Sequence, residues 1–555
     1  MPGSGPTHGE TLSRALQAID ERTFWSAYPE HAKAYGEEAP VEGEEAFKAH
    51  LGTEFDTGQA NDGFVAVEES SPYGLDLNIS YPKTTVDRVI ADAGSAMDSW
   101  RRTTPTERAD VCLEILSRLA DRSFEMAQAV MHTTGQAPTM AFQAGGPHAL
   151  DRALEAVAYA YREQNQLPGP TTWEKPQGSR PPLVIDKEWL IKPRGIAVTI
   201  GVSTFPTWNG YPGIFASLAT GNPVIIKPHQ ATVLPLALFT RIARAALAEM
   251  GHDPNVIQMI VDTPGNFVAK DLVMRPEVGI VDYTGGSAFG DWLETNVTHA
   301  EVYTEKAGVN SVILDSADDL KGVFRNLSVS MTMYSGQMCT TPQNLFVPAE
   351  GIPTADGIAT YDDIVAGFVG AIDGLLGDEA RAVSILGAIK GADTAARIDA
   401  AEGSGTVLSH SRTVTSDEFP DANIRTPAIV EVDAADKDTY MSEMFGPVIF
   451  VVKTGSRQES IDLAREAAIR SGAITWLAYA TEPDAIATII DAAVDGGVSV
   501  AFNLTGGLFV NQSAAYSDFH VTGANAAGNA SLTDPAFVTG RFHVIGVRME
   551  PAVAS

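Results

Sequence analysis

The chain has 555 residues, of which 44% are apolar and 19% charged, a composition typical of a globular protein rather than a disordered or fibrous one. At about 150 residues per domain, this length predicts three to four folding units. Acidic residues outnumber basic ones by 70 to 38, so the formal net charge is −32. Such a surface repels phosphate backbones and anionic lipids, so we expect neither nucleic acid nor membranes as partners. An anionic substrate would need a local basic pocket.

The sequence contains two cysteines, Cys112 and Cys339. They are too few for a disulfide framework or a four-cysteine zinc site, and they favour a reducing compartment. The N-terminal sequence MPGSGPTHGE has no apolar core, so we expect no signal peptide. The most apolar stretch, 211–226, is interrupted by glycines and prolines, so we expect no membrane span. These features predict a cytoplasmic protein without a metal site.

Residues 1–85 are typical of an extension added to a larger core. The aromatic spacing predicts a helix over 11–35, interrupted near Pro29, and an acidic, glycine-containing stretch follows it. Residues 64–82 favour extended pieces with turns. The simplest interpretation of the aromatic side chains is that they pack on a neighbouring domain.

From residue 86 to 163 the apolar residues recur at helical spacing in two long runs. Thr106 begins the second run and is a candidate cap, because a hydroxyl there can accept a backbone N–H. Cys112 lies on the apolar side of this helix, so we expect a buried structural thiol.

From residue 183 onward, β-rich runs alternate with amphipathic helices. We expect strands within 195–202, 222–228, 255–261 and 278–286, and crossover helices follow several of them. The alternation resumes after residue 311, with a helix over 319–337, a long helical stretch ending at 386, and later strands up to 503. This order predicts two α/β units with parallel sheets, which bind ligands at the carboxyl ends of their strands. The tail at 537–550 is a candidate edge strand that pairs with another subunit.

Common nucleotide, dinucleotide, metalloprotease and hydrolase motifs are missing from the sequence. Cys339 stands between a helical segment and a β-rich run, flanked by small and hydroxylated residues. Taken alone, a packing role is the simpler interpretation of this cysteine. Its context, Ser335-Gly336-Gln337-Met338-Cys339, instead resembles the nucleophile loop of the aldehyde dehydrogenase superfamily, which typically reads G-Q-x-C.

Further motifs of that superfamily occur here in the expected order. Glu305 stands 34 residues before Cys339 in the segment TEKAGVNSVI, at the place of the superfamily's E-L-G-G-K. The others are Trp208-Asn209 in FPTWNGYP, Lys227 in IIKPHQ, the turn Tyr283-Thr284-Gly285-Gly286-Ser287 closing at Gly290, Glu443-Met444-Phe445-Gly446-Pro447, and Asn503. Together they are far more specific than any single motif, and the resemblance covers roughly residues 86–530.

The resemblance implies a fold of two doubly wound parallel-sheet domains with an oligomerisation segment and an N-terminal extension. The expected division is an extension over 1–85, a dinucleotide-binding domain over 86–310 with oligomerisation strands near 183–198, a catalytic domain over 311–510, and a C-terminal return and oligomerisation tail over 511–555. The superfamily's habit and the edge-like tail imply a homodimer or homotetramer.

The resemblance also implies the chemistry. Cys339 would add to an aldehyde as a thiolate, and Asn209 with the Cys339 backbone N–H would stabilise the oxyanion. Glu305 would activate the water that releases the acid from the thioester. A solvated carboxylate beside Lys306 is the alternative interpretation of Glu305, and the effect of Lys306 on this base stays open.

Residues that would hold the pyridine nucleotide follow from the same motifs. The backbone of Gly285 and Gly286 would approach the pyrophosphate at a helix start, although a plain glycine turn is the alternative. By the resemblance, Lys227 would reach the adenosine ribose, Glu443 the nicotinamide ribose and Phe445 the ring; Trp208, Gln230 and Thr284 are further candidates for cofactor contacts. Members that prefer NAD often carry a glutamate where this chain has Gln230. A neutral amide there would repel a 2′-phosphate less, so we expect NADP, with NAD as the alternative.

The long N-terminal extension, the segment SPYGLDLNISYP and the altered E-K-A-G motif are similar to the PaaN-type branch of phenylacetate degradation. That branch implies oxidation of a ring-opened, CoA-linked semialdehyde to its carboxylic acid. Fusion relatives carry an added hydratase domain, so we expect a separate hydratase partner here. The alternatives are a general dehydrogenase for a simpler aromatic or aliphatic aldehyde and a catalytically silent scaffold on the same fold. A CoA-acylating variant fits less well, since Glu305 favours water as the acceptor.

Overall fold

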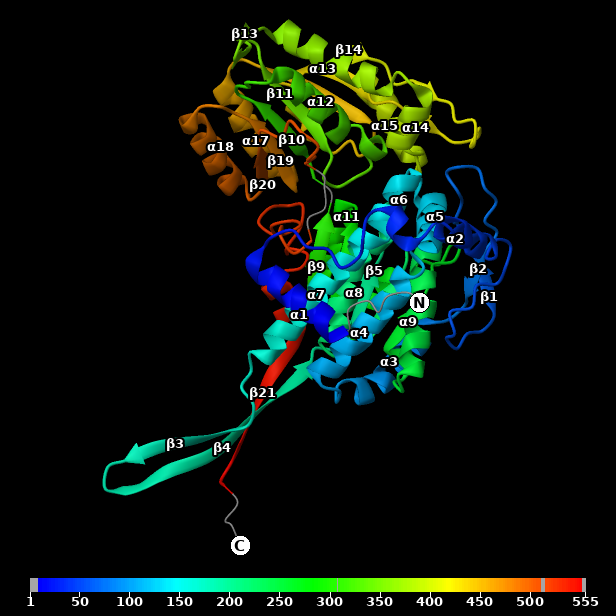
Figure 1. Ribbon diagram of the computed structural model, residues 1–555, viewed down its shortest axis with the longest axis vertical. Helices are drawn as coiled ribbons and strands as arrows, with labels where there is room; N and C mark the ends of the chain where they lie inside the picture. Colours follow the sequence, from blue (N-terminus) through cyan, green and yellow to red (C-terminus); the bar gives the residue numbers. More distant parts are fainter. Residues whose placement is uncertain (1–7, 307, 511–514, 552–555) are drawn as a thin grey trace.

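Two parallel sheets, each covered by helices on both faces, form the body of the protein in the computed structural model, which describes residues 8–306, 308–510 and 515–551 (Figure 1). A long antiparallel arm extends away from this body. The expectations for the first seven residues, and Ala307 of the E-K-A-G motif, lie outside the described residues. No helix in the described ranges is both long and apolar enough to cross a bilayer.

The N-terminal extension packs on the helices of the first unit. It comprises α1 (His8–Glu21), η1 (Ala32–Tyr35), α2 (Ala39–Lys48), β1 (Phe64–Ala66) and β2 (Ser80–Pro82). The expected helix over 11–35 is wrong beyond residue 21, because Arg22 takes a left-handed backbone with φ 53° and ends α1. The acidic stretch after it forms α2, which the sequence did not indicate. The expected packing of aromatic residues is confirmed for Tyr35, which contacts the rings of Phe124 and Phe142.

Residues 86–165 are helical, as predicted, but the second expected run is divided between α4 and α5 at residues 121–122. The helices pack on one another and on the first sheet. They are α3 (Val86–Trp100), α4 (Pro105–Ala120), α5 (Ser123–Thr134), α6 (Pro138–Gly145) and α7 (Pro147–Asn165). Cys112 is buried on α4, as expected. The cap of α4 is Thr104 rather than Thr106, because the Thr104 hydroxyl accepts the N–H of Glu107 and the Glu107 carboxylate accepts the N–H of Thr104.

The first sheet has five parallel strands in the order β7-β6-β5-β8-β9. Its elements are β5 (Ile196–Ile200), α8 (Pro206–Ala219), β6 (Val224–Lys227), α9 (Leu234–Glu249), η2 (Pro254–Val256), β7 (Ile257–Met259), α10 (Ala269–Val273), β8 (Val278–Gly285), α11 (Ser287–Asn296) and β9 (Glu301–Lys306). Ile196, Val198 and Ile200 face the cluster that includes α3, whereas Ala197 between them faces the cluster of α8 and α9. Strand β8 returns beside β5, so the topological switch point lies between these two strands.

The second sheet has the order β14-β17-β18-β11-β10-β19-β20, and all its pairs are parallel except β14-β17. Its strands are β10 (Asn310–Leu314), β11 (Pro342–Pro348), β14 (Thr406–Ser409), β17 (Ala428–Asp433), β18 (Val448–Thr454), β19 (Thr475–Tyr479) and β20 (Ser499–Phe502). Its helices are α12 (Leu320–Ser330), α13 (Tyr361–Leu376), α14 (Glu379–Leu386), α15 (Ala392–Glu402), α16 (Lys437–Tyr440), α17 (Arg457–Ser471) and α18 (Pro483–Gly496). Short elements complete the unit: η3 (Met333–Gly336), β12 (Ile352–Thr354), β13 (Gly357–Ala359), β15 (Thr413–Val414) and β16 (Ile424–Arg425).

The expected helix over 319–337 is interrupted. It divides into α12 and η3, and within η3 the residues Tyr334 and Ser335 leave the right-handed helical region. The long helical stretch before residue 386 is likewise divided by the hairpin β12–β13 and by the break between α13 and α14. The interruption at Tyr334 places the following residues, including Cys339, in a loop at the edge of the second sheet.

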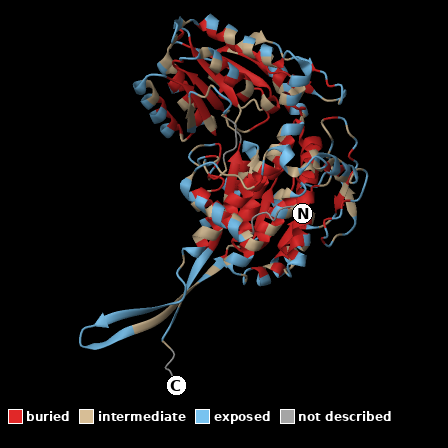
Figure 2. Cartoon of the chain, in the orientation of Figure 1, coloured by how far each residue is buried: buried red, intermediate tan, exposed pale blue. Residues whose placement is uncertain are grey.

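The arm is a three-stranded antiparallel sheet of β21 (Phe542–Met549), β4 (Arg180–Pro193) and β3 (Thr171–Gln177). The tail is therefore the edge strand that the sequence predicts. The expected range 183–198 for the arm covers only part of β4 and overlaps β5. Most of the arm is exposed, in contrast to the buried sheets of the body (Figure 2).

A buried ion pair joins the base of the arm to the first sheet. Arg541, immediately before β21, donates from both terminal guanidinium nitrogens to Asp282 on β8, at 2.8 and 2.6 Å. It also donates to the hydroxyl of Ser217 on α8. Helix α19 (Pro535–Thr539) precedes Arg541 and brings the chain to this position. Because both charged groups are buried and their contact is bidentate, the pair holds the C-terminal segment in one register.

Candidate active site

The loop that carries Cys339 has an unusual backbone. Tyr334, Ser335 and Gly336 take successive left-handed conformations, with φ values of 52°, 51° and 65°. A Cβ atom at Gly336 would lie 2.3 Å from the carbonyl oxygen of Gly446, so only glycine fits this contact. Two of the motifs found in the sequence, G-Q-x-C and E-x-F-G-P, therefore touch each other through their glycines.

Three residues predicted to act in catalysis converge at the junction of the two sheets. Glu305 stands at the carboxyl end of β9, Asn209 lies in the first turn of α8, and Cys339 is in the loop between η3 and β11. The Asn209 amide donates to Glu305 Oε2 at 2.7 Å. Nucleophile and oxyanion roles for Cys339 and Asn209 stay predictions, but the fold places both residues beside the same carboxylate.

The environment sets opposite protonation preferences for Glu305 and Cys339. Although burial alone would raise the pKa of Glu305, the charge and hydrogen bond of His520, the Cys339 thiol and Arg152 lower it below its usual value. Burial raises the pKa of the Cys339 thiol well above its usual value, and the nearby Glu305 carboxylate raises it further. The resting centre therefore holds a carboxylate next to a thiol, and Glu305 is placed to take the thiol proton.

Sequence reasoning missed His520, which completes this cluster. Its Nε2 atom lies 2.9 Å from Glu305 Oε1 and 3.8 Å from Cys339 Sγ. The Trp208 ring packs edge-on against the imidazole, with centroids 4.7 Å apart, and the Arg152 guanidinium lies over the Trp208 ring, 4.8 Å from its centroid. No motif surrounds His520 in the sequence, because only the return of the chain beside β9 brings it here.

Lys306 does not face Glu305. Adjacent strand residues point to opposite faces, and Lys306 bonds to Asp291 at 2.8 Å and Glu294 at 3.0 Å on α11. Burial lowers the pKa of Lys306, but these two carboxylates raise it overall. Gly290 makes room for the lysine stem, since a Cβ there would lie 2.5 Å from it. The charge of Lys306 is thus balanced on the far side of β9.

The end of β8 suits a dinucleotide. A Cβ at Gly285 would lie 2.4 Å from the Tyr283 hydroxyl, which itself donates to the Gly286 carbonyl at 2.8 Å and fixes the turn. Gly286 is the N-cap of α11, has no side-chain cap, and has open space where a Cβ would project. Free amides at a helix N-terminus beside open space fit a pyrophosphate. Thr284 precedes this turn and is half-buried.

Lys227 ends β6, one strand away from the switch point, and forms a buried ion pair with Asp262. Gln230 follows in a half-buried turn. Burial, helped by the charge of Lys227, lowers the pKa of the neighbouring His229 to about 4, so this imidazole is neutral at pH 7. The charges of Lys227 and Asp262 neutralise each other, so a ribose bound at this position would not lie beside an unpaired carboxylate.

Glu443 and Phe445 lie in the half-buried loop between α16 and β18. Burial raises the pKa of Glu443 to about 7, although the charge of Arg397 lowers it. The Phe445 carbonyl accepts a bond from Arg397 at 3.0 Å. Glu443 also raises the pKa of Cys339, so its charge acts on this sulfur. Asn503, by contrast, accepts a hydrogen bond from the Ala480 N–H and donates one to the Ala480 carbonyl, so its side chain stabilises the sheet.

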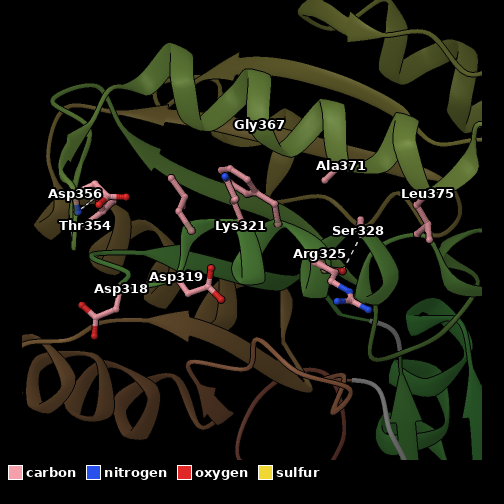
Figure 3. Close-up of a pocket in the computed structure, with 12 residues that line it drawn as sticks. Asp318, Asp319, Lys321, Arg325, Ser328, Thr354, Asp356, Gly367, Ala371 and Leu375 are labelled. Atoms are coloured by element: carbon pink, nitrogen blue, oxygen red, sulfur yellow. Dashed lines mark hydrogen bonds between the residues drawn. The ribbon is translucent and has the colours of Figure 1, made fainter.

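A further pocket lies in the second unit between α12, α13 and the hairpin β12–β13 (Figure 3). Its lining mixes three aspartates, Asp318, Asp319 and Asp356, with Lys321 and Arg325. None of the residues predicted from motifs lines it. The residues predicted to act in catalysis thus lie at the junction of the sheets and not in this pocket.

The comparisons with known proteins identify the family of the chain. The model of the aldehyde dehydrogenase family matches residues 79–493, about three quarters of the chain. The chain belongs to the aldehyde dehydrogenase family. It has the fold of that family, and its activity class is the NAD(P)-dependent oxidation of aldehydes.

The dehydrogenase is 51% identical to an NAD-dependent aldehyde dehydrogenase from Burkholderia multivorans, whose crystal structure superposes with a TM-score of 0.97 over 98% of each chain. That similarity includes the N-terminal extension, which precedes the family match. The dehydrogenase is also 27% identical to α-ketoglutarate semialdehyde dehydrogenase of Haloferax volcanii, over 69% of this chain and 74% of that protein. Aldehyde dehydrogenase LUC3 of a Fusarium species is 23% identical over 52% of this chain and 60% of its own length.

Proposed function

We propose that the dehydrogenase oxidises its aldehyde to a carboxylic acid through a thioester on Cys339, with Glu305 as the general base. The observation that carries this proposal is the cluster of Cys339, Glu305 and Asn209 at the junction of the sheets. Addition of the thiolate makes the aldehyde carbon tetrahedral and prepares it to lose a hydride. Water activated by Glu305 then releases the acid.

Asn209 has two tasks in this scheme. In the resting arrangement one N–H of its amide donates to Glu305, and in the reaction the amide would donate to the oxyanion. Together with the backbone N–H of Cys339 it would form the oxyanion hole, and the loss of one such donor costs about 3 kcal/mol of the barrier. Release from Asn209 would also free Glu305 to meet the hydrolytic water.

The decisive experiment separates an enzyme from a silent scaffold. Cys339→Ala abolishes turnover and iodoacetamide labelling at the site, whereas Cys112→Ala, at a buried thiol on α4, leaves both in place. Glu305→Gln gives a burst of reduced cofactor no larger than the number of active sites and then stalls, and the burst itself is slowed because Cys339 has lost its proton acceptor. Normal steady-state turnover by Glu305→Gln would contradict the base assignment, and turnover by Cys339→Ala would contradict the nucleophile.

The pyridine nucleotide would be held at the carboxyl ends of β5, β6 and β8. Gly285, Gly286 and Thr284 would meet the pyrophosphate, Lys227 and Gln230 the adenosine ribose, and Glu443 and Phe445 the nicotinamide end, with Trp208 near the reacting centre. When bound, the nicotinamide accepts the hydride that the tetrahedral carbon releases. Glu443 is best suited to accept ribose hydroxyl bonds above pH 7, where it is ionised.

We propose that NADP is accepted and preferred, because Gln230 leaves the ribose without a free carboxylate. The Burkholderia multivorans protein is described as NAD-dependent, so the preference needs direct measurement. Comparison of kcat/KM for the two cofactors tests it, and Gln230→Glu should lower kcat/KM for NADP at least about tenfold by charge repulsion. A large NAD preference in the unchanged protein would contradict this proposal.

For the substrate we propose the ring-opened, CoA-linked semialdehyde of phenylacetate catabolism, supplied by a separate hydratase. The support is the resemblance of the N-terminal extension and of the E-K-A-G motif to the PaaN-type branch. A simpler aromatic or aliphatic aldehyde is the alternative. A panel of CoA-linked and free aldehydes, compared by kcat/KM, decides between them, and equal rates with the free aldehydes would remove the argument for CoA.

A further inference from the structure

His520 makes a three-way contact at the reacting centre. Its Nε2 atom faces both Glu305 Oε1, at 2.9 Å, and Cys339 Sγ, at 3.8 Å. The three ligand-type atoms all lie within 4.8 Å of one another. Because a carboxylate only accepts hydrogen bonds, the short contact with Glu305 requires a hydrogen on Nε2.

We propose that His520 is a third member of the active centre, whose Nε2–H stabilises the negative charge on Glu305 before proton transfer and on Cys339 after it. This inference rests on the proposed nucleophile. In the transfer, the S–H bond of Cys339 breaks, its electron pair stays on sulfur, and the proton forms an O–H bond on Glu305. The pair carries one negative charge before and after, and the Nε2–H remains on the imidazole throughout.

The other charged groups around the pair do not replace this donor. Arg152, on α7, is buried and bonds to the carbonyl of Leu532 and to Glu155, so it acts on Glu305 only through its field. Glu443 adds a negative field at Cys339, which opposes thiolate formation. Asn209 donates to the other oxygen of Glu305. His520 is thus the side chain that bonds to the carboxylate and also faces the sulfur.

The N-terminal extension holds the loop that carries His520. Arg22 donates to the Ser517 carbonyl at 3.3 Å and lies over the Phe519 ring, with 3.9 Å to its centroid. Trp25 packs against Tyr516, with ring centroids 5.0 Å apart. On the other side, the Leu532 N–H donates to the His520 carbonyl at 2.9 Å. The imidazole is therefore positioned from two directions.

Alkylation of Cys339 by iodoacetamide in the cofactor-free enzyme tests the proposal, because it reports thiolate formation without aldehyde. We expect His520→Phe to raise the pH midpoint of alkylation by about one unit, because the variant loses a hydrogen-bond donor to the charged pair. Below the midpoint the rate then falls about tenfold. His520→Gln keeps an N–H donor and should shift the midpoint much less.

His410→Gln is the matched control, because His410 also bonds to a glutamate, Glu402, at 2.9 Å, but at an exposed site. It should leave the midpoint unchanged. An unchanged midpoint in His520→Phe, or an equal shift in Phe and Gln variants, would overturn the inference. If His520→Phe does not fold, the comparison of His520→Gln with His520→Asn, whose shorter amide cannot reach both partners, gives the same test.

Failure of this inference can be told apart from failure of the proposed function. If Cys339→Ala keeps turnover, the nucleophile itself is wrong and the proposed function fails. If Cys339 is required and reactive but its midpoint is insensitive to residue 520, only the role of His520 fails. A purely structural role would lower the amount of active enzyme without moving the midpoint.

Discussion

At the residue scale, the nucleophile loop depends on backbone conformations that most residues avoid. Left-handed φ values at Tyr334 and Ser335 cost on the order of 1 kcal/mol each. Their side chains offset part of this cost, since the Tyr334 hydroxyl donates to the Thr134 carbonyl at 2.6 Å and the Ser335 hydroxyl to the Leu386 carbonyl at 3.1 Å. The strain lies immediately before the sulfur, where it sets the direction in which the loop presents Cys339.

Gly336→Ala should disturb this loop. The new methyl group would collide with the Gly446 carbonyl in a left-handed backbone, so we expect a loss of about 2–4 kcal/mol in the free energy of unfolding and a drop in kcat. Chemical denaturation and steady-state kinetics measure both. Gly370→Ala on α13 is the control, because open space surrounds that position and alanine favours a helix. Equal behaviour of the two variants would contradict the role of the Gly336–Gly446 contact.

Asp151 should make the stability depend on pH. Burial raises its pKa to about 7, although Ser26, Ala27 and Tyr516 donate hydrogen bonds to it. Between about pH 4 and 7 the folded state holds a proton that the unfolded state has released, so the free energy of unfolding falls as pH rises through this window.

Asp151→Asn removes that titration and should reduce the loss of unfolding free energy between pH 5 and 8 by about 2–3 kcal/mol. Thermal unfolding at several pH values measures the slope. Asp356→Asn, an exposed position in the turn between β12 and β13, should leave the slope of the unchanged protein in place. An Asp151→Asn slope as steep as that of the unchanged protein would rule out this carboxyl as its source.

At the element scale, helix α4 begins with a reciprocal cap. Thr104→Ala removes the acceptor for the Glu107 N–H and should cost about 1 kcal/mol of unfolding free energy. Thr106→Ala, two residues on at an exposed position inside the helix, should change it by less than about 0.5 kcal/mol. Urea denaturation of both variants distinguishes the two threonines, and a larger effect at Thr106 would reverse the assignment.

Elements that repeat a local pattern could be predicted from the sequence, and elements set by distant contacts could not. Most strands of both sheets were predicted because their apolar runs are bounded by turn residues, whereas β9 and β14 were missed. Helix α2 was missed because its acidic residues and Gly43 suggest a loop. Gly43 is needed there, since a Cβ would lie 2.4 Å from the Phe124 side chain.

The same distinction applies to the active site. Motif order in the sequence indicated Cys339, Glu305 and Asn209, and the fold brings them together. His520 has no such motif, and its position follows from hydrogen bonds between the segment 525–529 and β9. The Lys306 side chain points away from that of Glu305 because β9 extends through Lys306 and successive strand residues face opposite sides of a sheet.

At the scale of the whole molecule, the arm is notable for large apolar side chains that face solvent. Its exposed apolar side chains are Trp173, Leu183, Leu190, Val544, Ile545 and Met549. Exposed apolar strands with unpaired edges are typical of surfaces that another chain covers. We propose that the arm joins copies of this dehydrogenase into a dimer or tetramer.

Leu190→Asp together with Ile545→Asp should therefore reduce the molar mass in solution, because these residues are directly paired on β4 and β21 and a buried charge opposes association. Light scattering after size exclusion measures the mass. Ile358→Asp, at an exposed residue of β13 on the second unit, is the control and should leave the assembly intact. If the doubly substituted arm gives the same mass as the unchanged protein, the arm is not the interface.

The pairing of Arg541 with Asp282 has a consequence for synthesis on the ribosome. Asp282 belongs to the middle of the first sheet, yet its partner is translated about 260 residues later, after the whole second unit. Until Arg541 is synthesised, the Asp282 carboxylate lacks its guanidinium partner, and burial of this unpaired charge in the sheet is unfavourable. We expect nascent chains released before residue 541 to leave the first sheet incompletely packed. Proteases that do not cleave the full-length enzyme should therefore degrade them.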